Sequence, residues 1–408
     1  MTTKIKFPSI FLLFVLPLLF VRCSNDDEAA VIPNIEEKVS EFKYLRILVS
    51  DENSPTLTLV NPNLNTALSF ESKFPKSALY ASDSGRFGTI LHRDNNLTET
   101  FDTGLEFHGD HVDVKGTPKF GVLTGVSSKP THFKSNFGEI LTFNDGDGTL
   151  AVGKESEMHN ANATMTIVNA GLLAHHGAMA VFSNGTYAIT EKDNSISGTL
   201  PERVKIIDKT GTQLFVSTLA TTGIHGNASD GQHAVFGSSS GILVVKSNGQ
   251  QELIPHPDGF GTTWFGTILE TSTVGNFVGF TAAKGAFLIN VLDKTVKPIY
   301  ESTDIMQCKI SYDNNMLGIL LHSGNFISYN LSSLSVATSE VNLIEATPKT
   351  STKKPQMVLT QRFVYITAPA TGELQIFNIK KSSDARKIKV SAAPYRLSIM
   401  GFENSTDH

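Results

Sequence analysis

The chain has 408 residues, with 34 basic residues, 39 acidic residues and a formal net charge of −5 at pH 7. Because the charges nearly balance and no basic run occurs, we expect no nucleic-acid partner. There are only two cysteines. If the first is modified, no internal disulfide can form, and stability must come from the core.

The N-terminus predicts export. Residues 1–22 read as a lipoprotein signal peptide, with two lysines before an apolar run over residues 10–21. Cys23 follows, with Leu19 four residues before it, as in the box where bacterial lipoproteins are cut and lipidated. Arg22 departs from that box, which normally has a small residue there. We expect lipid on Cys23, with ordinary cleavage or a retained anchor as the alternatives.

Residues 23–40 are predicted to be an acidic flexible tether. Its start, residues 24–28, resembles the acidic export tag on surface lipoproteins of the Bacteroidota. The expected location is therefore the bacterial cell envelope, lipid-anchored, either in the periplasm or on the outer-membrane surface. Residues 41–402 are predicted to form one domain, and residues 403–408 a short C-terminal tail.

The body of the chain repeats one pattern. A short strand is followed by a turn of small or polar residues, and then by an apolar strand of about five residues. Successive copies are offset by roughly 40 to 55 residues, the length of four short antiparallel strands and the period of propeller blades. The sequence therefore predicts an all-β fold, a single β-propeller. The copies begin near Ser77, His132, His176, His225, Trp264, Lys309, Gln356 and Tyr395.

The two ends of the repeat region complement each other. Residues 44–49, 57–60 and 67–70 read as three strands without a first partner, and residues 395–399 as one strand without followers. Pairing them in one blade would close the ring and leave no exposed sheet edge. This count favours eight blades, with seven as the alternative, and a monomer.

Histidines fall where inner strands begin. His132, the pair His175 and His176, and His225 stand at the starts of three consecutive predicted blades. In a propeller these positions surround one mouth of the central channel, so residues far apart in sequence meet there. Neutral imidazole nitrogens suit zinc, which takes three or four ligands at about 2.0–2.2 Å.

The connection before His132, which begins the first of these three blades, carries two more histidines. His108 and His111 occur in residues 107–113, with Asp113 beside them, and we expect the loop to lie over the same mouth. A mobile loop would suit capture and release of an ion. Alone, the spacing of His108 and His111 is weak evidence for a metal site.

Ordinary structural roles account for the other candidates. His159 is interpreted as a surface residue, Asp145 as part of a β-turn and not of a calcium loop, Trp264 as channel wall and Cys308 as a buried thiol. The remaining histidines look scattered: His92, His233, His256, His322 and His408.

At these residues the chain resembles the AztD family of periplasmic zinc metallochaperones, which are β-propellers. The resemblance covers most of the chain after the tether. It is carried, in order, by residues 108–111, 130–133, 143–146, 175–177, 224–226, 234–237 and 393–395. It implies zinc binding and transfer to the solute-binding protein of a zinc ABC transporter, without catalysis. It implies these candidate ligands: His108, His111, His132, His176 and His225, with His175 and Asp113 as further candidates, in one site or two.

Two departures from the family stand out. Thr221 and Ser238 occupy the places of a cysteine pair, and family members are usually soluble, whereas this chain carries an expected lipid anchor on Cys23. Two other functions remain open. A three-histidine zinc site could activate water, with Glu106, Asp110 or Asp145 as the base. Alternatively, the propeller could be a surface module that binds proteins or glycans.

Overall fold

The computed structural model describes residues 39–406, so the predicted signal peptide and Cys23 lie outside the described part. Within this part the chain is all-β apart from two single turns of 3₁₀ helix, Arg93–Asn95 and Glu155–Glu157. No helix among these residues is long and apolar enough to cross a membrane.

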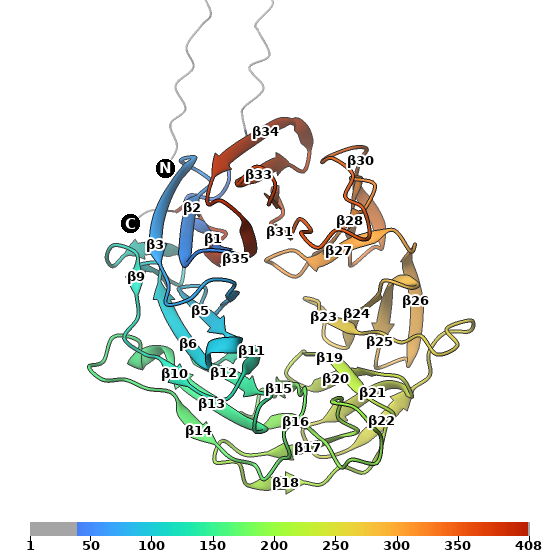
Figure 1. Cartoon of the computed structure of the whole chain (residues 1–408). Coiled ribbons are helices and arrows are strands. Elements are labelled where there is room, and N and C mark those ends of the chain that lie inside the picture. Colours follow the sequence, from blue (N-terminus) through green and yellow to red (C-terminus); the bar gives the residue numbers. More distant parts are fainter. Residues whose placement is uncertain (1–38, 407–408) are drawn as a thin grey trace, which may run out of the picture. The chain divides into compact units, whose positions relative to one another are not determined.

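Eight antiparallel sheets surround a central channel, seven with four strands and one with five (Figure 1). The predicted propeller is confirmed, with eight blades. The channel is lined by the inner strand of each blade: β35 (Pro394–Gly401), β4 (Ala78–Ala81), β11 (Pro130–Asn136), β15 (Met179–Val181), β19 (Ile224–Ser229), β23 (Thr267–Glu270), β27 (Ile305–Ile310) and β31 (Met357–Leu359).

The other strands follow outward in the same order. The second strands are β1 (Leu45–Asp51), β5 (Phe87–His92), β12 (Glu139–Asn144), β16 (Tyr187–Glu191), β20 (His233–Ser238), β24 (Asn276–Thr281), β28 (Met316–Leu321) and β32 (Phe363–Ala368). The third strands are β2 (Thr56–Asn61), β6 (Leu97–Asp102), β13 (Thr149–Lys154), β17 (Arg203–Ile207), β21 (Gly241–Lys246), β25 (Gly285–Asn290), β29 (Phe326–Asn330) and β33 (Glu373–Asn378).

The outer strands are more exposed. They are β3 (Thr66–Glu71), β9 (Lys119–Phe120) with β10 (Gly125–Val126), β14 (Thr166–Val168), β18 (Gln213–Phe215), β22 (Gln251–Ile254), β26 (Thr295–Glu301), β30 (Ser335–Glu340) and β34 (Lys381–Lys389). One element stands apart from the blades. It is a two-stranded hairpin, β7 (Leu105–His108) and β8 (His111–Val114), inserted after the third strand β6.

Strands from the two ends of the chain close the ring. β1 pairs antiparallel with β35, with Ile47 opposite Ile399 and Leu45 opposite Gly401. This is the closure that the terminal strand pattern predicts. It satisfies the inner edge of β1, which would otherwise present unpaired backbone groups to other chains.

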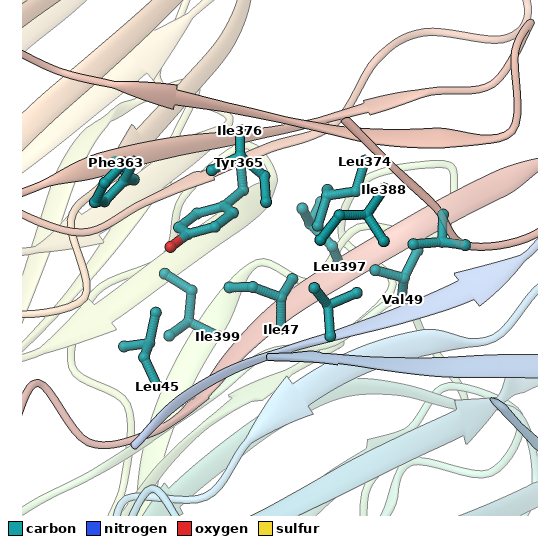
Figure 2. Close-up of a cluster of buried hydrophobic side chains, with 12 residues drawn as sticks. Leu45, Ile47, Val49, Phe363, Tyr365, Leu374, Ile376, Ile388, Leu397 and Ile399 are labelled. Atoms are coloured by element: carbon teal, nitrogen blue, oxygen red, sulfur yellow. The ribbon is translucent and has the colours of Figure 1, made fainter. Parts of the chain in front are cut away.

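The core lies between neighbouring blades. Side chains alternate along a strand, so Ile47 packs toward the blade of β31 to β34, whereas Leu48 packs toward the blade of β4 to β6. Figure 2 shows the first of these clusters, where Ile47 and Ile399 meet Tyr365 and Leu374. Because both faces of a second strand are covered, strands such as β28 and β32 read as nearly continuous apolar runs and not as alternating ones.

The antiparallel order gives the ring two distinct faces. At one end of the blade of β4 to β6, Ala78 pairs with Leu91 and Leu91 with Thr98; at the other end, Phe87 pairs with Asp102. We call the end at which the inner strands begin the mouth face, and the opposite end the hairpin face. A six-residue strand such as β5 separates them by about 20 Å.

Candidate metal centre

Irregular strand pairing positions two of the three histidines at the mouth face. The register of β11 against β12 shifts between Pro130 and His132. The register of β19 against β20 shifts between Ile224 and Asn227, on either side of His225. A bulge of this kind re-aims a side chain. His176 lies three residues before β15, in the connection that leads into the channel.

The three imidazoles of His132, His176 and His225 are mutual neighbours. Ring centroids lie 4.8 Å apart for His132 and His176, 5.2 Å for His176 and His225, and 6.3 Å for His132 and His225. Residues 44 to 93 positions apart in sequence thus meet at one rim, as the blade count predicts. Trp264 flanks the group, with its ring 6.4 Å from that of His225.

A carboxylate completes this group, which we call the mouth cluster: His132, His176, His225 and Asp145. Candidate ligand atoms of His132, His176 and Asp145 all lie within 4.8 Å of one another. Asp145 directly follows β12, in the turn to β13, and that turn lies at the mouth face because Arg93 from the neighbouring blade reaches both Thr131 and Asp145. The sequence predicts the turn, and it offers Asp145 only as the base of a hydrolytic zinc site and not as a residue that orients a ligand.

Asp145 orients the ring of His176. Nδ1 of His176 donates to Oδ2 of Asp145 at 2.7 Å, which leaves Nε2 with its lone pair free to ligate a cation. The same oxygen accepts from Arg93 at 3.3 Å, and Oδ1 accepts from the backbone of Gly177 at 3.4 Å. Burial alone would raise the pKa of Asp145, but the hydrogen bond from His176 and its charge lower it overall.

His225 is held in the same tautomer by the backbone. Its Nδ1 donates to the carbonyl oxygen of Gly266 at 2.7 Å, so its lone pair also lies on Nε2. The neighbouring Gly226 has φ +81°, and a Cβ there would lie 2.6 Å from the same carbonyl oxygen. This position therefore requires glycine, because the two backbones approach closely.

His132 differs from His176 and His225 in its hydrogen bonding. Its Nε2 is buried and has no hydrogen-bond partner among the described residues. Burial, followed by the nearby charge of His176, lowers the pKa of His132 to about 4. The ring is therefore neutral at pH 7, the state in which imidazole binds zinc. A buried nitrogen with an unused lone pair costs free energy unless something binds it.

His175 points elsewhere. It is buried, its Nδ1 bonds to the carbonyl oxygen of Leu173 at 2.7 Å, and its Nε2 bonds to the hydroxyl of Thr190 at 3.0 Å. Both ring nitrogens are thus engaged. The structure does not bring His175 into the mouth cluster, and we assign it a structural role.

The hairpin β7–β8 lies on the opposite face, which corrects the expectation that it covers the same mouth. Arg86, in the turn from β4 to β5, contacts Glu106 at 3.5 Å, and Phe107 stacks on Phe402 beyond the end of β35. Both contacts are at the hairpin face. The physical reason is parity: the hairpin follows a third strand, and after three antiparallel strands the chain has crossed to the other end of the blade.

His108, His111 and Asp113 nevertheless form a second group, the hairpin cluster, with candidate ligand atoms within 4.8 Å of one another. Asp113 lies 3.4 Å from Nδ1 of His108 and 3.6 Å from Nε2 of His111. Lys115 also contacts Asp113 at 2.8 Å and lowers the pKa of its carboxyl. A cation that bound here would compete with the Lys115 ammonium.

The other described histidines have protein partners outside both clusters, in agreement with the scattered pattern. His92 pairs with Glu99, His233 with Asp230, His256 with a backbone carbonyl and His322 with another. His159 is exposed, as its surface interpretation predicts, and its ring also bonds to the buried Asp102 at 2.7 Å. His408 lies outside the described residues.

The remaining residues singled out in the sequence have structural roles. Cys308 is a free, buried thiol, as predicted, and burial raises its pKa to about 12. Thr221 and Ser238, at the positions of the family's cysteine pair, are buried and donate to the backbone carbonyls of Glu202 and Gly241.

The fold and the mouth cluster define an eight-bladed β-propeller with a candidate metal centre at one end of its channel. In a comparison with curated proteins, the chain is 22% identical over 375 residues to the zinc chaperone AztD of Citrobacter koseri. The alignment covers 87% of this chain and 86% of that protein. The predicted resemblance to AztD is confirmed. No family model matches the chain.

Solved structures agree on the fold. A crystal structure of Citrobacter koseri AztD superposes with a TM-score of 0.79 at 17% sequence identity, over 89% of this chain and all of that one. The structure of apo AztD from the same organism superposes with a TM-score of 0.77 at 16% sequence identity, over 88% of this chain and 99% of that one. Dihydro-heme d1 dehydrogenase NirN matches with a TM-score of 0.60 at 12% identity, over 86% of this chain and 74% of that one. Because this last relative is a dehydrogenase, the propeller alone does not decide function.

Proposed function

We propose that this protein is a zinc metallochaperone of the bacterial cell envelope, which captures Zn²⁺ through histidines and hands it to a zinc-uptake system. One observation carries the proposal: three imidazoles from successive blades converge at the mouth. Two of them are fixed so that the lone pair of Nε2 is free to bind a metal ion. The similarity to the zinc chaperone AztD supports the same reading.

The mouth cluster fits zinc in its donor set. Nε2 of His132, His176 and His225 would supply three neutral nitrogens, with Asp145 behind His176 as the carboxylate that orients the ring and raises its basicity. Three protein ligands leave a coordination position for an incoming donor. Because zinc is here the cargo and not a resident cofactor, an incomplete shell suits release.

The hairpin cluster is a second proposed site. It is more exposed, and Lys115 competes for its carboxylate, so we expect the weaker affinity there. The two clusters lie on opposite faces and cannot share one ion, so the expected capacity is two ions.

Transfer would proceed by ligand exchange, in which donors of a recipient replace the chaperone's histidines one at a time. The proposed recipient is the solute-binding protein of a zinc ABC transporter. We propose that lipid on Cys23 holds the protein at the membrane, and that it acts as a monomer.

The decisive experiment measures zinc content and transfer with the purified protein and its His132→Ala/His176→Ala/His225→Ala variant. We expect wild type to retain zinc through gel filtration and to deliver it to an apo zinc-binding protein, and the variant to lose the tightly held ion. Equal zinc content in the two proteins would overturn the mouth site.

A hydrolytic zinc site is the competing function, because three nitrogens and an open position can also activate water. Asp145 is poorly placed as the base, since its oxygens already accept from His176, Arg93 and Gly177. Turnover of ester or phosphoester substrates that needs His176 would favour hydrolysis over transfer.

A further inference from the structure

A cavity opens at the mouth face, beside the mouth cluster. It has a volume of about 420 Å³ and is lined by residues of the inner strands β27, β31, β35 and β4, and by Pro130 and Thr131 at the start of β11, the strand that carries His132. Arg93 links the two, because it lines this cavity and also contacts Asp145 at 3.3 Å. We call this cavity the cationic pocket, because cationic side chains line it.

The pocket has an unbalanced charge. Four cationic residues line it, Lys76, Arg93, Lys309 and Arg396, against one carboxylate, Asp94. That carboxylate is largely exposed and lies 3.4 Å from Arg93. Among residues 39–406, no carboxylate lies within ion-pair distance of Lys76, Lys309 or Arg396.

Arg396 is held ready for a ligand. One of its terminal nitrogens donates to Oε1 of Gln356 at 2.6 Å, and its guanidinium lies 4.6 Å from the centre of the Tyr395 ring. Its Nε has no acceptor in the described part of the chain. A planar guanidinium fixed in this way can offer its free N–H groups to an oxyanion without losing much conformational freedom.

Lys309 lies close enough to Arg396 to be affected by its charge. Desolvation first, and then the guanidinium of Arg396, lower the pKa of Lys309. Two like charges in a half-buried cavity repel each other, and an anion between them would remove that cost. Tyr80, Leu79 and Met357 supply apolar walls around the charged groups.

We propose that the cationic pocket binds a small organic anion. Arg396 and Lys309 would hold a carboxylate of this anion, and the tyrosine and aliphatic walls would cover its carbon skeleton. A pocket of this volume accommodates a small molecule. The mixed lining favours an organic carboxylate over a bare inorganic oxyanion, which would leave the apolar walls unused. The anion would sit beside the metal centre without being one of its ligands.

The test is isothermal titration calorimetry on the metal-free protein, with all chelator removed by dialysis, using succinate, citrate and inorganic phosphate as separate probes. We expect saturable binding of one carboxylate per chain, weakened at least tenfold in Arg396→Gln and in Lys309→Met. Lys154→Met, an exposed lysine on another blade, is the matched control and should bind as wild type.

Circular dichroism on each variant checks that it is folded, and Lys76→Met at the exposed rim gives a further variant of the pocket if substitution of Lys309 or Arg396 unfolds the chain. Absence of saturable binding for both carboxylates, or unchanged affinity in the folded pocket variants, would overturn the proposal. Phosphate binding as tightly as succinate would overturn the organic class. Because metal is absent throughout, failure here is distinct from failure of the zinc proposal.

Discussion

His176 and Asp145, 31 residues apart, are joined by a 2.7 Å hydrogen bond at the channel mouth. Asp145→Asn keeps the shape but removes the charge that fixes the tautomer. We expect zinc affinity at the mouth to fall about 10- to 100-fold, measured by competition with a chelator of known affinity.

The matched control for Asp145 is Asp147→Asn in the same turn. Its carboxylate accepts from Thr149 and contacts no histidine, so its loss should leave zinc affinity unchanged. Equal effects of the two substitutions would show that the turn itself, and not the contact with His176, matters.

Separate faces predict independent sites. His108→Ala/His111→Ala should lower zinc stoichiometry by one ion while the affinity of the mouth site stays the same, because about 20 Å separates the two faces of a blade. Titration followed by mass spectrometry of the native protein counts the ions. His256→Ala, which alters neither cluster, serves as control. A change in mouth affinity in the hairpin variant would contradict independence.

Zinc binding should weaken below about pH 6, since protonated imidazole cannot ligate. Burial lowers the pKa of His132 to about 4, so this residue stays neutral through that range, and any loss between pH 6 and 5 must come from other ligand groups. Affinity measured from pH 7.5 to 5 checks this. A flat profile would remove histidine ligation from the account.

The same residue affects the stability of the metal-free protein. His132 takes up a proton near pH 6.5 when unfolded but only near pH 4 when folded, so the unfolded state binds more protons between these values. Stability should therefore fall as pH drops from about 6.5 toward 4, by up to about 2 kcal/mol at pH 5. His132→Asn should flatten this slope in urea titrations at pH 7.5 and 5. An identical slope in both proteins would refute the assignment.

Ring closure should dominate the stability of the first blade. Ile47 is fully buried opposite Ile399, and Ile47→Ala should cost about 2–5 kcal/mol of unfolding free energy, read from urea denaturation. Leu68→Ala on the exposed outer strand β3 should change it by less than about 0.5 kcal/mol. Similar losses at both positions would mean that the closure contributes no special stability.

The sequence predicted the fold well because one physical unit repeats. A strand buried on both faces needs an apolar run, and a tight turn needs small or polar residues, so each blade leaves the same pattern. Even the closure was visible, since residues 44–70 and 395–399 each lack the partners that the other provides.

The site was less visible because it depends on side-chain direction. His175 and His176 are adjacent and chemically equal, and only their contacts separate them: one bonds to Thr190 in the interior, the other faces Asp145. The sequence presents Asp145 as a turn residue, or as the base of the hydrolytic alternative. The sequence predicts the wrong face for the hairpin, because its position after a third strand does not stand out from the residue pattern.

The pairing of β1 with β35 has a consequence for biosynthesis. Leu45 pairs with Gly401, so the ring cannot be completed until the chain has been made as far as β35. During that interval one strand offers its backbone groups to any neighbouring extended segment, which is a risk for misassembly. The closing step of folding is therefore expected to be slow and to depend on an intact β35, because it joins strands that are far apart in the sequence.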